Sequence, residues 1–171
     1  MHITCATCVL RPLSAADAAV LASHANDRGV WRNLRDRFPH PYTEKDAEAY
    51  IEAVFDREQR TIFGIVAEGE AAGSIGLVPG DDIARNTAEV GYWLGRRFWG
   101  RGITTDALGA VTTYAFTELG MHRVFAAPFV HNAAWCRVLE KAGYAVEGRM
   151  RRSAVKDDQV LDQWLYAAYA D

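Results

Sequence analysis

Residues 89–108 read EVGYWLGRRFWGRGITTDAL, and this stretch decides the fold. In its first six residues, Val90, Tyr92 and Leu94 alternate with Glu89, Gly91 and Trp93. This alternation, with its aromatic and branched residues, predicts a strand as far as Leu94. From Ile103 an apolar residue recurs at every fourth position up to Ala115, which predicts a long helix. Gly120 stands where a glycine often ends a helix. The sequence therefore predicts a strand, a glycine-bearing loop and a long helix in direct succession.

The loop at residues 95–102 has the features of an anion-binding site. Gly100 and Gly102 permit close approach of the backbone to a ligand. The first N–H groups of a helix lack partners within the helix, and the helix dipole makes this end partly positive. Three arginines add guanidinium groups that suit phosphate: Arg96, Arg97 and Arg101. We interpret the loop as a phosphate site; the alternative is a tight turn with a solvated basic edge.

Two familiar phosphate-binding motifs fit this loop poorly. In the P-loop pattern, Arg101 takes the place of the lysine, and Gly102 takes the place of the hydroxyl residue that would hold Mg²⁺. In the dinucleotide fingerprint, Thr105 takes the place of the third glycine. The loop therefore indicates a different phosphate ligand.

The segment from Arg97 to Gly102, RFWGRG, resembles the Q/R-x-x-G-x-G/A signature of the GCN5-related N-acetyltransferases. The surrounding G-Y-W-L-G-R-x-x-W-G-R-G-I-x-T is similar to the RimJ/RimL branch, the ribosomal-protein-alanine acetyltransferases. The similarity continues at residues 10–13 and from Asn132 to Tyr144, so it covers nearly the whole chain. The resemblance implies acetyl-CoA as cofactor, with the pyrophosphate of coenzyme A on the loop amides.

The resemblance also implies an α/β fold with a mixed, mostly antiparallel sheet of about seven strands, flanking helices and a splayed parallel pair that admits the pantetheine arm. It implies the following cofactor-binding residues: Trp93, Leu94, Arg97, Trp99, Gly100, Arg101, Gly102, Ile103, Thr104, Thr105, Asn132 and Lys141. The implied reaction moves an acetyl group to a primary amine, a protein N-terminus or a small-molecule amine, by direct attack in a ternary complex.

Periodicity and turn residues predict the elements around the central stretch. We expect strands at residues 8–13, 61–68, 74–79, 87–94, 122–129, 144–152 and 159–169, and helices at residues 14–26, 43–54, 103–119 and 133–142. A strand, helix and strand in this order form a right-handed crossover, so residues 122–129 should run parallel to residues 88–94. Pro128 cannot donate a ladder hydrogen bond, so pairing should break near it.

Composition narrows the class of protein. A chain of 171 residues predicts one domain over residues 1–171, and the net charge of −3 argues against a general nucleic-acid partner. No apolar run approaches the roughly 20 residues of a membrane helix, and no signal peptide is visible, so we expect a cytoplasmic protein without a membrane partner. Cys5-x-x-Cys8 has no second pair, so we expect free thiols and no metal site. The sequence leaves open whether the protein forms a homodimer.

Acetyl transfer to an amine needs a base, and Glu89 is the candidate. It lies on the strand that leads to the phosphate loop, and the resembled family places a glutamate with this role on that strand. The alternative is a structural carboxylate paired with an arginine. The family commonly has a serine, assigned as the acid that protonates the leaving thiolate, where this chain has Trp135. The indole N–H of Trp135 is not an acid at neutral pH. Tyr144 and Cys136 are weak substitutes, and transfer without an acid is the other alternative.

The acceptor has no signature in the sequence. In the resembled family the early helices and their loop form one wall of the acceptor site, so His40 and Tyr42 could contact the substrate. The alternative is that His40 faces solvent and Tyr42 packs in the core. A different acyl-CoA, an antibiotic or polyamine acceptor, and a non-catalytic CoA-binding module remain alternatives to the acetyltransferase interpretation.

Overall fold

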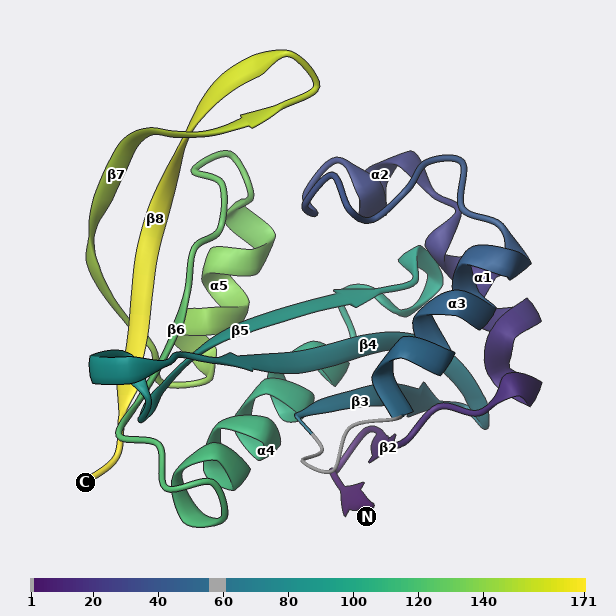
Figure 1. Cartoon of the computed structure of the whole chain (residues 1–171), viewed down its shortest axis with the longest axis horizontal. Helices are drawn as coiled ribbons and strands as arrows, with labels where there is room; N and C mark the ends of the chain where they lie inside the picture. The colour runs from purple at the N-terminus through teal and green to yellow at the C-terminus, as the bar shows by residue number, and fades with distance from the viewer. Residues whose placement is uncertain (1, 56–60) are drawn as a thin grey trace. The chain divides into compact units, whose positions relative to one another are not determined.

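The computed structural model describes residues 2–55 and 61–171. Its strands form one open sheet in the order β1-β2-β3-β4-β5-β6-β8-β7, flanked by helices (Figure 1). The pair of β5 with β6 is parallel, and β1–β2, β2–β3, β3–β4, β6–β8 and β7–β8 are antiparallel. The predicted fold class is confirmed, with an eighth strand, β1, that the sequence pattern did not reveal.

The strands and helices are as follows: β1 (Ile3–Thr4), β2 (Val9–Arg11), α1 (Ala18–Ala25), α2 (Arg28–Trp31), α3 (Glu44–Phe55), β3 (Ile62–Ala67), β4 (Glu70–Pro79), β5 (Thr87–Leu94), α4 (Ile103–Thr117), β6 (Arg123–Ala126), α5 (Ala133–Lys141), β7 (Ala145–Lys156) and β8 (Gln159–Tyr169). Single 3-10 turns lie at Ala15–Asp17, Asp82–Ala84 and Arg96–Phe98. The chain divides into two compact units, Met1–Gly76 with Tyr92–Ala107 and Leu77–Gly91 with Leu108–Asp171.

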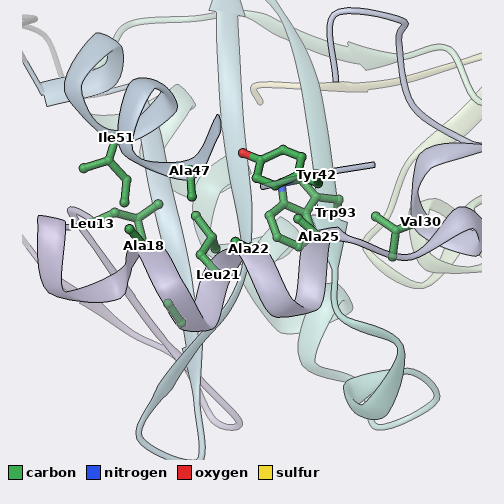
Figure 2. Close-up of a cluster of buried hydrophobic side chains, with 11 residues drawn as sticks. Leu13, Ala18, Leu21, Ala22, Ala25, Val30, Tyr42, Ala47, Ile51 and Trp93 are labelled. Carbon is green, nitrogen blue, oxygen red and sulfur yellow. The ribbon is translucent and has the colours of Figure 1, made fainter. Parts of the chain in front are cut away.

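The core of the first unit lies where α1 and α3 pack on the sheet (Figure 2). Leu21 and Ala25 of α1 and Ala47 of α3 have no exposed surface, because helical spacing brings their side chains to one stripe. Trp93, near the end of β5, belongs to the same cluster and is 9% exposed. This core therefore fixes the end of the strand from which the phosphate loop departs.

Side-chain caps stand at the start of α3 and at the start of the 3-10 turn Ala15–Asp17, where the sequence predicts helix starts; α1 itself begins only at Ala18. The Asp17 carboxylate accepts hydrogen bonds from the N–H and hydroxyl of Ser14, at 2.7 and 3.0 Å. Asp46 accepts from the N–H and hydroxyl of Thr43 at 2.7 and 2.6 Å. These reciprocal caps satisfy donors that a helix start leaves unpaired.

The hairpin between β3 and β4 is tighter than predicted. The sequence interpretation gave residues 69–73 to the connection, whereas Glu70 is already the first residue of β4. The turn consists of Glu68 and Gly69, which both have positive φ, 53° and 86°. Such a two-residue turn matches the twist of the flanking strands.

The second unit contains the predicted parallel pair. The register of β5 with β6 runs from Thr87↔Arg123 to Glu89↔Phe125, while β5 itself continues to Leu94. Strand β6 ends at Ala126, three residues earlier than predicted. Beyond it the chain pairs with β8, because Pro128 accepts from the N–H of Trp164 at 2.9 Å. The two parallel strands thus diverge after Glu89, as expected.

Helix α5 also begins and ends as predicted. The side chain of Asn132 caps it by accepting from the N–H of Trp135 at 3.2 Å. The long hairpin of β7 and β8 follows, drawn in yellow in Figure 1. Within residues 2–55 and 61–171, no helix combines the length and the apolar character that a membrane crossing needs.

Candidate active site

The phosphate loop, residues 95–102, joins β5 to α4 in the first unit. Gly100 and Gly102 have φ of 73° and 79°, a region that favours glycine. A Cβ built on either residue would meet no atom within 4 Å, so open space lies beside both. Backbone that turns this way and borders open space fits the approach of a phosphate group.

The first turn of α4 adds backbone donors to the loop. The N–H of Asp106 donates to the carbonyl oxygen of Gly102 at 3.0 Å and so begins the helical ladder. The N–H groups of Ile103, Thr104 and Thr105 precede this bond and stand at the positive end of the helix dipole. Ile103 is 3% exposed and anchors the turn, whereas both threonines are half-buried.

An aromatic anchor holds the loop in place. Phe98 has no exposed surface, and the His24 ring meets it edge-on with centroids 5.3 Å apart. The guanidinium groups of Arg97 and Arg101 lie over the same ring, at 4.8 and 5.7 Å from its centroid. Trp99 donates its indole N–H to the carbonyl of Leu94 at 2.7 Å. Packing and hydrogen bonds within the protein therefore hold the loop in this conformation.

All three arginines of the loop contact carboxylates of the same unit. Arg97 binds Glu68 at 3.0 Å and Glu70 at 2.8 Å, and Arg101 binds Glu68. Hydrogen bonds from Arg101 and then Arg97 lower the pKa of Glu68. These carboxylates offset the guanidinium charge of Arg97 and Arg101.

Arg96 has a different partner. Its Nε and Nη2 atoms each donate to the Asp27 carboxylate at 2.7 Å, and its guanidinium lies over the Trp99 ring. This hydrogen bond lowers the pKa of Asp27 to about 2. The partners Asp27, Glu68 and Glu70 were not found by sequence reasoning.

The second unit holds the remaining candidates. Glu89 is half-buried at the last registered position of the parallel pair. Asn132 caps α5, and Lys141 is exposed in its last turn. Trp135 is half-buried in the first turn of α5. The roles of these residues toward cofactor and acceptor, like those of the phosphate loop, stay predictions.

The two weak candidates for an acid are poorly suited to that role. The Tyr144 hydroxyl hydrogen-bonds with Thr112 at 2.7 Å, and burial raises the pKa of Tyr144 to about 12. Cys136 is 9% exposed, and burial raises the pKa of its thiol. Cys5 and Cys8, in the turn between β1 and β2, are free thiols, as is Cys136.

The predicted acceptor contacts separate into two cases. Tyr42 is 6% exposed and packs against Phe38 with ring centroids 4.7 Å apart, so packing is its role. His40 is exposed, and its ring lies tilted against that of Trp31 with centroids 5.7 Å apart. Of the two, His40 is the one that a ligand can reach.

The family of this chain is shown by comparison with known proteins. Residues 8–145 match the acetyltransferase (GNAT) domain family, and the chain belongs to that family. It is an acyltransferase and, more narrowly, a GNAT N-acetyltransferase.

Known relatives and solved structures agree with this assignment. A probable N-acetyltransferase of Bacillus subtilis, YjcK, is 31% identical over 91% of this chain and 92% of its own. The spermidine N(1)-acetyltransferase of Escherichia coli is 27% identical over 82% of this chain and 74% of its own. Among solved structures, RimL, a ribosomal L7/L12 alpha-N-protein acetyltransferase in complex with coenzyme A, superposes with a TM-score of 0.88 at 21% identity, covering 100% of this chain and 99% of its own.

Proposed function

We propose that this enzyme moves the acetyl group of acetyl-CoA to a primary amine, a protein N-terminus or a small-molecule amine, by direct attack in a ternary complex. One observation carries the proposal: two glycines of positive φ border open space directly before the first turn of α4. Backbone donors at a helix start bind phosphate groups. The coenzyme A complex of the RimL structure supports the same cofactor.

The residues that would hold the cofactor follow from its chemistry. The pyrophosphate would lie on the amides of residues 100–105, with Arg97 and Arg101 near it. Trp93, Leu94 and Trp99 from the strand end and loop, with Asn132 and Lys141 from α5, are the remaining proposed contacts. When bound, acetyl-CoA supplies an activated thioester, and the protein binds and orients it.

Glu89 is our proposed base. Most alkyl amines are protonated at neutral pH, so the acceptor must lose a proton before or during attack. A carboxylate at the point where the parallel strands diverge can accept that proton directly or through one water. A backbone N–H near Leu94 is our proposed donor to the developing oxyanion.

No side chain needs to act as the acid for the leaving thiol. A thiol of pKa near ~8.5 leaves reasonably well as a thiolate. The indole N–H of Trp135 is not an acid at neutral pH. The raised pKa values of Tyr144 and Cys136 make proton release from these groups unfavourable.

A thiol-release assay with dithionitrobenzoate across a panel of peptides and small amines tests the proposal. We expect free thiol in amounts equal to acetylated product, dependent on both acetyl-CoA and amine. Tight binding of acetyl-CoA without turnover on any amine would instead indicate a non-catalytic module.

A further inference from the structure

Residues 27–42, named here the arginine loop, form a closed structure within the first unit. The N–H of Tyr42 donates to the side-chain oxygen of Asn26 at 3.0 Å, which brings the two ends together. The Asp27 carboxylate accepts from the N–H groups of Gly29 and Val30, at 2.6 and 3.3 Å, and thereby caps α2. The loop is thus built by its own hydrogen bonds.

The arginine loop is attached to candidate site residues of its own unit. At its start, Asp27 receives both hydrogen bonds from Arg96 of the phosphate loop. Near its end, Phe38 meets Trp93 edge-on with ring centroids 5.5 Å apart. Val30 and Tyr42 belong to the same buried cluster as Trp93, and Figure 2 shows Tyr42 next to Trp93. An acceptor bound on this loop would therefore lie next to the end of β5 and the start of the phosphate loop.

The exposed side of the loop is strongly basic. Within ten residues it presents four exposed arginines: Arg28, Arg32, Arg35 and Arg37. Asp36 is the one acidic residue in that stretch, and Asp27 just before it is committed to Arg96. Val30, Leu34 and Phe38 pack the loop against the core of its unit, and the Arg28 guanidinium lies over the Trp31 ring at 5.7 Å. A local cluster of this kind in a chain of net charge −3 indicates a specific anionic ligand.

We propose that the arginine loop binds an acidic polypeptide, whose N-terminal amine is the acceptor. This inference rests on the proposed function and specifies its acceptor. Guanidinium groups pair with carboxylates through two parallel hydrogen bonds. Four such groups spread over ten residues suit several carboxylates along a peptide, whereas a small anionic amine could engage one or two. A polyamine would meet like charges, which disfavours it.

The test compares N-terminal peptides of one length whose second to sixth residues are acidic, amide or basic, with spermidine and a small amino dicarboxylate as further acceptors. We expect the highest kcat/KM for the acidic peptide and a steep loss of this preference with added salt. Arg32→Glu/Arg37→Glu should lower its kcat/KM by about tenfold or more, mainly through KM. The amide peptide should be nearly unaffected.

Controls separate this inference from the proposed function. Arg85→Glu, an exposed arginine of the second unit, should change none of these values. Arg32→Ala/Arg37→Ala, with unchanged acetyl-CoA affinity and circular dichroism, excludes a folding defect. Equal use of all three peptides, a preference for spermidine, or equal sensitivity of the small dicarboxylate would overturn the inference while transfer itself stands. Absence of thiol release with every amine would overturn the proposed function instead.

Discussion

Glu89 combines the two properties that a base in this enzyme needs. It is half-buried, and it occupies the last registered position of β5 opposite Phe125 on β6. Beyond this point the two strands no longer share a ladder, and we propose that the amine and the thioester meet there. The position of the carboxylate thus follows from where the parallel pairing ends.

Glu89→Gln keeps the shape of the side chain and removes its basicity. We expect kcat to fall by roughly 10²–10⁴-fold, the range of general-base catalysis, with acetyl-CoA affinity nearly unchanged. The acid limb of the pH–rate profile should also flatten. Glu118→Gln, an exposed glutamate just after α4, is the matched control. Wild-type kcat with an unchanged profile would assign the base to another group.

Trp135 occupies the position at which the resembled family commonly has a serine assigned as the acid for the leaving thiolate. Because thiolate release needs no acid, Trp135→Ser should retain transfer at the wild-type rate or above it. Steady-state kinetics with the best amine of the panel provide the measurement, and Cys136→Ala, which alters the neighbouring buried thiol, should leave the rate unchanged. A large loss of kcat with intact acetyl-CoA affinity would mean that the indole shapes the acceptor pocket.

Asp27 links the phosphate loop to the arginine loop, and its pH dependence has a definite sign. Its folded pKa, about 2, lies below the unfolded value near ~3.9, so the Arg96 contact stabilises the fold above ~pH 4 and is lost as the pH falls toward 2. Asp27→Asn keeps a capping oxygen but loses this contact. Urea unfolding should give a constant deficit from pH 7 to 5 that shrinks at pH 3.

Asp27→Ala supplies the comparison for that measurement. Because it also removes the cap of α2, it should cost about 0.5–2 kcal/mol more than a variant that keeps the cap. A deficit of Asp27→Asn that stays equal at pH 7 and pH 3 would contradict the role of the charge.

At the scale of elements, the phosphate loop is a strand end and a helix start joined by two left-handed glycines. Phe98 and the carboxylates of Glu68 and Glu70 hold it from the side of the protein. A Cβ built on Gly100 or Gly102 would meet open space. The side chains thus fix the shape of the loop, and we propose that its backbone binds the ligand.

Gly102→Val places a branched side chain where φ is 79° and where the backbone should meet phosphate. We expect acetyl-CoA affinity, measured by calorimetry, to fall severely. Gly120→Val is the matched control, because its φ of 64° imposes a similar strain at the end of α4 and open space surrounds its Cβ. Equal acetyl-CoA affinity of both folded variants would exclude the pyrophosphate assignment.

At the scale of the whole molecule, ligand binding to the folded chain should raise its thermal stability. At a ligand concentration of 100 Kd, the gain is about 2.7 kcal/mol by mass action. For a chain of 150–250 residues this corresponds to a rise in Tm of roughly 5–11 °C. Scanning calorimetry with acetyl-CoA should give this rise for the wild type and a much smaller one for Gly102→Val. An unchanged wild-type Tm at saturating acetyl-CoA would contradict cofactor binding.

The sequence by itself determined the elements that depend on short-range physics. Periodicity defined β5 with both of its ends, and capping residues defined the starts of α3 and α5 and of the 3-10 turn that leads into α1. The strand–helix–strand order and the crossover rule predicted the parallel pair, and the resemblance of residues 97–102 and their surroundings predicted the family. The single domain and the roles of the site residues stay predictions.

The tertiary structure decided which charges meet and how the weakest elements form. Arg96 reaches Asp27 across 69 positions, and Arg101 reaches Glu68 across 33. Strand β1 has two residues and is defined by its pairing with β2. Two residues are too few to show a periodic pattern in the sequence. Local sequence patterns encode the propensity of each element, whereas packing between distant segments determines which charges form ion pairs. The attachment of the arginine loop to the phosphate loop could therefore be recognised only in the tertiary structure.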